Sequence, residues 1–378
     1  MAELTPKERV MRLLRKEPID TMPFFSGMGM VVMPGIEKSG YKFATVHTDA
    51  ERMAMSAIWS AKLMGFDCVV IPYDMTMESE AMGNQISLYA DTEDILYPTI
   101  PEKIWSTIDE VVIPENILEC GRLPLIPKVI EIIKKEAPEL PIGCWQLGPF
   151  TQAGQILELD LILKGVFKQK AKVEALLDKL TDMIIKIGQW LQASGCDYIT
   201  LREPGVAADL LSPRTFKEFI KPRLTRILAA WESPKLLHIC GKTDPLIEMM
   251  NECGADGLTV DIKCNVAEAR KKLGNDILFM GNLDTYPMTC DADTPAEKTI
   301  AHIKEIIDNG VDAVMPGCDL WPAIIETNMK AAVDTTHEYG KKTESGGRKA
   351  LTHFCPQTSA TDVGNRSDST ESDRFQAK

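Results

Sequence analysis

This chain has no long apolar run, no excess of basic charge and few histidines. No stretch approaches the roughly 18–20 apolar residues that cross a bilayer, and the polar residues 1–9 lack the apolar core of a signal peptide. Lys and Arg number 42 against 55 Asp and Glu, giving a formal charge of −13 at pH 7, which disfavours a nucleic-acid backbone as partner. We therefore expect a cytoplasmic protein that binds neither membranes nor nucleic acids.

Cysteine is plentiful, with ten residues in 378, whereas histidine occurs five times. In a long chain without a secretion signal, cysteines are expected to stay reduced rather than form a disulfide framework. Most of them are then small buried apolar side chains, and a few are free for metal or redox chemistry. We assign Cys68, Cys144 and Cys196 to the core because their neighbours are apolar.

Short β-rich runs alternate with helical patterns along the chain. A capped helix opens the chain: Thr5 is placed to cap it, Pro6 suits its first position, and Glu8 completes a capping box. The eight predicted strands are 22–25, 68–72, 142–146, 198–201, 236–239, 257–260, 277–281 and 313–317. The predicted helices between or after them are 50–64, 170–194, 213–229, 243–252, 265–273, 295–308 and 322–340.

Eight strands alternating with helices predict a parallel sheet, and eight strands can close into a (β/α)₈ TIM barrel. Gly195, Gly254 and Gly310 each stand two residues before an Asp at a strand entry, which is typical of a helix end followed by a short turn. The alternative is an open doubly wound sheet, but no Gly-x-Gly-x-x-Gly phosphate motif opens a helix. We expect one barrel domain over residues 1–342, with an N-terminal helical extension, and a disordered polar tail over 343–378.

The strongest chemical signal is a pair of soft metal ligands at the end of the fifth predicted strand. His238 and Cys240 are two residues apart, so their side chains leave the strand on the same face. Cys318 stands at the end of the eighth predicted strand, and barrel active sites form where strands end. One His and two Cys suit a catalytic Zn²⁺ with an open fourth position. A single cysteine at a strand end is more typical of packing, and it is the equivalent strand-end position of Cys318 that favours a metal site.

The chain resembles the uroporphyrinogen decarboxylase superfamily, in its corrinoid-dependent, methylcobamide:coenzyme M methyltransferase-like branch. The resemblance runs from about residue 4 to 340 and rests on His-Ile-Cys-Gly at 238–241 and Pro-Gly-Cys at 316–318. Further segments that carry it are 4–10, 78–83, 148–151, 203–204, 211–213 and 281–282.

This resemblance implies a zinc-dependent methyltransferase that moves a methyl group from a methylated corrinoid, such as methylcobalamin, to a small-molecule thiol such as coenzyme M. Zinc would activate the acceptor as a thiolate. An Asp-x-His-x-x-Gly corrinoid motif does not occur in the sequence, so the corrinoid is expected on a partner protein. Alternatives are a metal-free decarboxylase, which the Arg-free segment 22–30 disfavours, a tetrahydrofolate acceptor, and a non-catalytic corrinoid-binding module.

Other polar residues near predicted strand ends are weaker candidates. Glu203 is a candidate catalytic residue, either as a displaceable zinc ligand or as a group that orients a ligand. The structural alternative is a carboxylate paired with Arg202 or solvated at the rim. Asp319 stands where the resemblance implies a small residue, and it could bond a ligand or exclude an anionic thiol. The remaining substrate-binding candidates are Asn282, Asp284, Gln146 and Tyr73.

Overall fold

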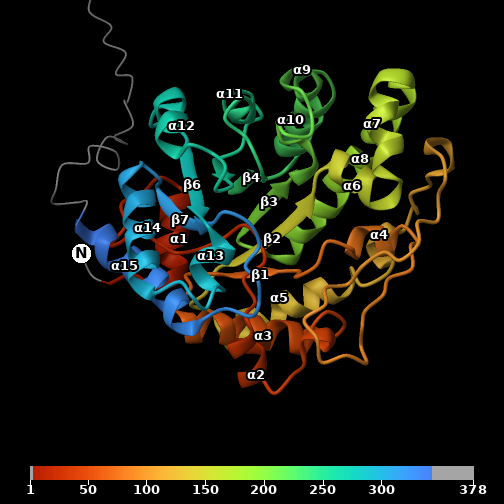
Figure 1. Ribbon diagram of the computed structural model, residues 1–378. Coiled ribbons are helices and arrows are strands. Elements are labelled where there is room, and N and C mark those ends of the chain that lie inside the picture. The colour runs from red at the N-terminus through yellow and green to blue at the C-terminus, as the bar shows by residue number, and fades with distance from the viewer. Residues whose placement is uncertain (1–2, 343–378) are drawn as a thin grey trace, which may run out of the picture.

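The computed structural model describes residues 3–342, so the predicted tail 343–378 lies outside the described residues. Seven parallel strands pair in the order β1-β2-β3-β4-β5-β6-β7. They are β1 Val69–Ile71, β2 Ile142–Leu147, β3 Tyr198–Arg202, β4 Lys235–Ile239, β5 Gly257–Val260, β6 Leu278–Leu283 and β7 Ala313–Pro316. In Figure 1 the strands curl around a common axis and helices lie outside them, which confirms the (β/α)₈ barrel class.

The helices follow the predicted alternation closely. They are α1 Pro6–Leu14, α2 Met33–Lys38, α3 Ala50–Met64, α4 Met77–Ala81, α5 Leu125–Glu136, α6 Pro149–Ile156, α7 Leu159–Lys168, α8 Lys170–Ser194, α9 Pro213–Thr215, α10 Lys221–Ala230, α11 Ile247–Asn251, α12 Val266–Leu273, α13 Thr285–Thr289, α14 Ala296–Asp308 and α15 Glu326–Lys342. A π-helical turn over Phe216–Ile220 joins α9 to α10. Within residues 3–342, no helix combines the length and apolar character needed to cross a bilayer.

The first predicted strand is shorter than expected. Instead of a full strand over 22–25, Phe24 forms a single parallel bridge to Val314 of β7. Pro23 has no backbone N–H to donate, and the N–H of Ser26 bonds to the sulfur of Cys68 instead of to a neighbouring strand. The one bridge nevertheless joins both edges of the seven-stranded sheet, because the carbonyl of Phe24 also accepts a bond from the N–H of Asp67 beside β1.

A Gly-x-Asp turn precedes four strands, β1, β3, β5 and β7. Its glycines, Gly65, Gly195, Gly254 and Gly310, all have positive φ. Gly65 and Gly195 end their helices directly, whereas Gly254 and Gly310 follow within three residues of a helix end. The following Asp67, Asp197, Asp256 and Asp312 each accept a bond from the backbone N–H of the preceding strand segment, at 2.8 Å. The sequence predicts such a turn at Gly195, Gly254 and Gly310, and the structure adds a fourth at Gly65-Phe66-Asp67. Each turn fixes the spacing of two neighbouring strands at their amino ends.

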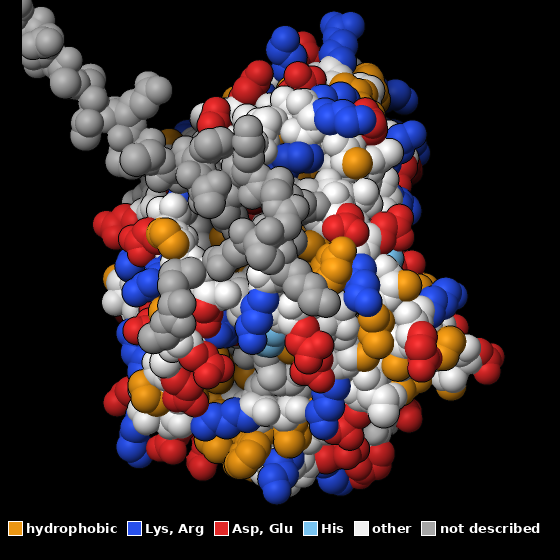
Figure 2. Space-filling view, turned by 90° about the vertical axis from the view of Figure 1, so that its left-hand side faces the viewer, with side chains coloured by type: hydrophobic (Ala, Val, Ile, Leu, Met, Phe, Trp, Pro, Cys, Tyr) orange, Lys and Arg blue, Asp and Glu red, His pale blue; other side chains and the backbone are white. Residues whose placement is uncertain are grey.

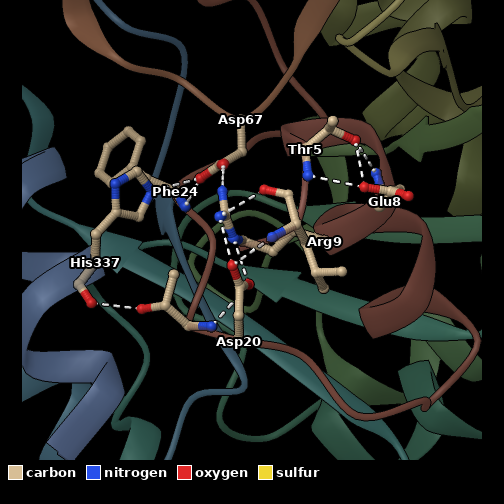
Figure 3. Close-up of polar contacts among 9 residues, drawn as sticks. Thr5, Glu8, Arg9, Asp20, Phe24, Asp67 and His337 are labelled. Carbon is tan, nitrogen blue, oxygen red and sulfur yellow. Dashed lines mark hydrogen bonds and ion pairs between the residues drawn. The ribbon is translucent and has the colours of Figure 1, made fainter. Parts of the chain in front are cut away.

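Asp67 also ties the two ends of the described chain together (Figure 3). Its carboxylate accepts bonds from Arg9 of α1 at 2.6 Å and from Phe24 N–H at 2.8 Å, and it lies 2.6 Å from His337 Nε2 of α15. Arg9 in turn bonds to Asp20, and Thr5 and Glu8 form the predicted capping box of α1. A cavity of about 630 Å³ lies beside this network, at the opposite end of the barrel from the strand ends.

The surface carries charges of both signs. On the face shown in Figure 2, acidic and basic side chains are interspersed and form no continuous field of one sign. Beneath it, apolar side chains from the strands and the surrounding helices form one buried cluster.

We predict that Asp67→Ala destabilises the fold by about 3–5 kcal/mol, because it leaves Arg9 buried without one of its two carboxylates and frees the Phe24 N–H. Asp334→Ala, on an exposed position of α15, is the matched control and should change stability by less than about 0.5 kcal/mol. Urea unfolding of both variants provides the measurement. Equal midpoints for the two variants would show that barrel closure does not depend on Asp67.

Candidate active site at the carboxyl ends of β4 and β7

His238 and Cys240 lie where the sequence predicts them, at the end of β4. The sheet register pairs His238 with Arg202 on β3 and with Thr259 on β5, so these three side chains leave the sheet on one face. The Nδ1 atom of His238 lies 2.5 Å from the hydroxyl of Thr259. This contact orients the ring so that Nε2 lies 2.9 Å from the sulfur of Cys240.

Cys318 lies beside Cys240 although it follows β7, which is separated from β4 by two strands of the sheet. It follows β7 after Gly317, and its sulfur lies 3.6 Å from that of Cys240. The structure therefore brings together the imidazole and the two thiols that the sequence singled out. Cys68 and Cys144 are buried as expected for core residues, and Cys196 is half-buried against the core.

Burial and one nearby positive charge set the protonation of this group. Burial, together with the guanidinium of Arg202, lowers the pKa of His238 to about 3, so the imidazole is neutral. The hydrogen bond from Cys240 lowers the pKa of the Cys318 thiol, and Arg202 also favours its thiolate. The pKa of Cys240 is raised correspondingly, because it donates that bond and is buried.

The fit of these three side chains to a metal ion can be judged from their separations. Among residues 3–342, no group of three His, Cys, Asp or Glu side chains has the spacing of a ready-made metal site. Tetrahedral zinc would place two sulfurs about 3.8 Å apart and a nitrogen and a sulfur about 3.6 Å apart. The sulfur pair, at 3.6 Å, is close to that value, whereas the His238–Cys240 contact, at 2.9 Å, would have to open. The donor set suits zinc, and a small outward shift of the His238 ring would admit it.

Glu203 occupies a different position from the one its place after β3 suggests. Its carboxylate is fully buried and accepts bonds from the backbone N–H groups of Phe150, at 3.2 Å, and Thr151, at 2.7 Å, and from the Thr151 hydroxyl. It therefore caps the first turn of α6, and burial raises its pKa to about 7. Ligation of zinc by Glu203 stays a prediction, and it would require breaking these three bonds.

Arg202 is the charged residue that the sequence reasoning treated only as a partner for Glu203. The structure instead pairs it with Asp319: Nη2 lies 2.5 Å from the Asp319 carboxylate, whose other oxygen accepts the Gly29 N–H at 2.9 Å. Arg202 is 2% exposed, its Cζ lies 4.3 Å from the centre of the Trp145 ring, and its Nε and Nη1 have no hydrogen-bond partner. A sequence signal was available, because an arginine ending an otherwise apolar strand must find a buried counter-charge.

The remaining substrate-binding candidates differ in position and in role. Asn282 donates to the carbonyls of Asp261 and Cys264, so it holds the loop after β5. Asp284 stands at the start of α13, and its pKa is raised by burial. Gln146 is fully buried, and neither of its side-chain polar atoms has a hydrogen-bond partner. Its register partner, Leu201, lies one residue before Arg202, so Gln146 leaves the sheet on the face opposite His238.

Tyr73 lines a cavity of about 430 Å³ beside this group. Asp319 lies on its wall, so the cavity adjoins the residue that follows Cys318. The connection between β1 and β2 supplies most of the other lining residues, among them Tyr97, Thr99 and Lys103. This long segment covers part of the mouth and gives the site a side chamber.

Glu78 on α4 is a buried carboxyl group near the mouth. It is 5% exposed, and burial raises its pKa from 4.5 to about 7. The folded protein thus keeps a proton on Glu78 between pH 4.5 and about 7, where the unfolded chain has lost it. Stability from this group is therefore present below pH 4.5 and is lost as the pH rises to about 7.

We predict that Glu78→Gln gains stability relative to the unaltered protein as the pH rises from 5 to 8, by up to about 3 kcal/mol, since the amide cannot ionise. Urea unfolding at both pH values measures the difference. Glu131→Gln, at an exposed position of α5, is the control and should track the unaltered protein. A Glu78→Gln difference that does not change with pH would contradict the raised pKa.

The arrangement so far defines a (β/α)₈ barrel enzyme architecture with a soft histidine–dithiol group at the carboxyl ends of its strands. A family model described as uroporphyrinogen decarboxylase (URO-D) matches residues 5–339. The chain belongs to the uroporphyrinogen decarboxylase family, as its sequence motifs indicated.

Among its relatives, the methylcobamide:CoM methyltransferase MtaA of Methanosarcina barkeri (strain Fusaro / DSM 804) is 31% identical over 341 residues, covering 90% of this chain and 99% of that protein. A solved structure described as a methyltransferase from Methanosarcina mazei superposes with a TM-score of 0.82 at 30% identity, over 88% of this chain and 98% of that one. The uroporphyrinogen decarboxylase of Shewanella loihica is 24% identical over 302 residues, covering 75% of this chain and 83% of that protein.

Proposed function

We propose that this protein is a zinc-dependent methyltransferase that moves a methyl group from a methylated corrinoid, carried on a partner protein, to a small thiol of the class to which coenzyme M belongs. His238, Cys240 and Cys318 would hold the metal. The observation that carries the proposal is the convergence of these three soft donors from β4 and β7, with separations of 2.9 and 3.6 Å. Relatives near 30% identity, named as methylcobamide:CoM methyltransferases, support it.

Each residue of the group has a chemical task in this reaction. Zinc, when bound, supplies a Lewis acid that lowers the pKa of an acceptor thiol at its fourth position. With a metal bound, the neutral imidazole of His238 would offer the lone pair of Nε2, while Nδ1 bonds to Thr259. The buried guanidinium of Arg202 favours the thiolate forms of Cys240 and Cys318. The side chains thus supply orientation and charge before any substrate arrives.

We predict that the purified protein binds one zinc ion per chain and that Cys240→Ala and Cys318→Ala each abolish stoichiometric binding, because two remaining protein ligands hold zinc far less tightly than three. Metal analysis by mass spectrometry measures the content. Cys290→Ala, at a half-buried cysteine in the loop after α13, is the control and should retain the metal. Full zinc retention by both site variants would overturn the assignment.

The same preparations distinguish the alternatives. Methyl transfer from methylcobalamin to a thiol, followed by the absorbance of the reduced cobalt, should require the zinc-loaded protein. Activity on a porphyrinogen that a chelator leaves unchanged would favour decarboxylation, whereas transfer to tetrahydrofolate but to no thiol would change the acceptor class. Cobamide binding without transfer to any acceptor would favour a non-catalytic module.

Apolar side chains on the mouth loops support the partner-protein part of the proposal. Leu210, after β3, is 54% exposed, and Tyr286, after β6, is 62% exposed. Ile262, after β5, and Trp321, after β7, are also exposed. Exposed apolar groups around a concave site are typical of a surface that another protein covers.

We predict that the double variant Leu210→Asp/Tyr286→Asp raises the KM for the methylated corrinoid protein about tenfold or more, since a charge at each position must be desolvated on docking. Its activity with free methylcobalamin should be unchanged. Asn275→Asp, in the exposed turn before β6 at the other end of the barrel, adds one negative charge away from the mouth as a control. An equal loss with both donors would show that these residues act on the site itself and not on docking.

A further inference from the structure

Asp319 lies between the histidine–dithiol group (His238, Cys240 and Cys318) and the neighbouring cavity. It follows Cys318 directly, and its side chain, 34% exposed, lies on the wall of the cavity of about 430 Å³. Each of its two oxygens accepts one bond, from Gly29 N–H and from Arg202 Nη2. A carboxylate oxygen has two acceptor sites, so both oxygens can accept a further hydrogen bond from a ligand in the cavity.

The cations around this cavity are already paired. Arg202 has Asp319 as counter-charge. Arg122 is held by Asp74 and Glu80, at 2.9 and 2.6 Å. Lys103 donates to the carbonyls of Gly154 and Leu157, and Glu158 lies 3.7 Å away. These three cations face four carboxylates, so the chamber offers an anionic ligand no uncompensated positive charge.

The cavity wall has a second feature that suits a cation. Tyr73 and Tyr97 both line it, and the ring of Trp321 lies 6.4 Å from that of Tyr97. Aromatic faces attract ammonium groups through their negative quadrupole. A carboxylate with free lone pairs beside aromatic rings is a recognised setting for an amine, whereas a sulfonate would meet the negative charge of Asp319.

We propose that this cavity receives the tail of the acceptor thiol and that Asp319 selects an acceptor with an ammonium group over one with a sulfonate. This inference rests on the proposed methyl transfer to a thiol. Asp319 acts here on specificity: the sulfur of the acceptor would lie at the thiol group, and the ammonium group would lie against the carboxylate. Both positions belong to one continuous wall, because Cys318 and Asp319 are adjacent.

Three acceptors of equal length test the proposal. They are 2-aminoethanethiol, 2-mercaptoethanol and 2-mercaptoethanesulfonate, with methylcobalamin as donor and the zinc-loaded protein as catalyst. The informative variant is Asp319→Asn, which keeps an oxygen for the Gly29 N–H but loses the negative charge and the oxygen that accepts from Arg202 Nη2. For each acceptor the kcat/KM of the variant is divided by that of the unaltered protein, so that differences in intrinsic thiol reactivity cancel.

We predict that this quotient falls for the amine, stays near one for the alcohol and rises for the sulfonate, so that the amine-to-sulfonate selectivity drops about tenfold or more. Glu131→Gln removes an exposed carboxylate of α5 that does not line the chamber, and it should leave the selectivity unchanged. Thermal melting checks that both variants fold. Calorimetric titration with the methylated products, 2-(methylthio)ethylamine and 2-(methylthio)ethanesulfonate, measures the same preference without turnover.

The outcomes separate this inference from the proposed function. If no thiol is methylated by the zinc-loaded protein, the proposed function fails. If 2-mercaptoethanol is methylated but Asp319→Asn leaves the amine-to-sulfonate selectivity unchanged, the proposed function stands and the assignment of Asp319 is overturned. A preference of the unaltered protein for binding the sulfonate product would overturn it as well.

Discussion

A carboxylate at the entry of every second strand is the constraint on which the barrel depends. Asp67, Asp197, Asp256 and Asp312 each hold the backbone N–H of the preceding strand segment at 2.8 Å. At the ends of a pair of parallel strands few backbone hydrogen bonds remain to fix their register. A charged acceptor that binds a backbone N–H there holds the two strands in register. The barrel is thus built from four pairs of strands, and the pair made by Phe24 and β1 is the one that closes it.

Closure decides the chemistry, because it brings β7 round to the side of the barrel opposite β4. Cys240 and Cys318 are 78 residues apart in the chain and come from strands separated by two others in the sheet, yet their sulfurs lie 3.6 Å apart. Side chains at the ends of such strands meet only across the interior of a closed ring. A shift of one residue in the β3–β4 register would turn His238 away from Arg202 and from the interior.

The sequence predicted the parts of this structure that depend on local chemistry. The bounds of α3 and α8 agree with prediction because their ends are encoded locally: Asp49 caps the start of α3, and Gly65 and Gly195 end the two helices in left-handed conformations. The histidine–dithiol group was found because strand ends in a barrel share one edge. The partners of Glu203 and Arg202 were not predictable, because several carboxylates and donors follow different strands and only their three-dimensional placement decides which ones meet.

The charge balance of the mouth explains why Arg202 and Asp319 belong together. A buried guanidinium favours thiolates at Cys240 and Cys318, but an unpaired one is costly to bury. Pairing with Asp319 from the solvent side offsets that cost, while leaving Nε and Nη1 without partners within the protein. In the proposed reaction, the carboxylate that pairs with Arg202 would also be the charged surface that an incoming acceptor meets. The electrostatics of the histidine–dithiol group would therefore also restrict which acceptors can approach it.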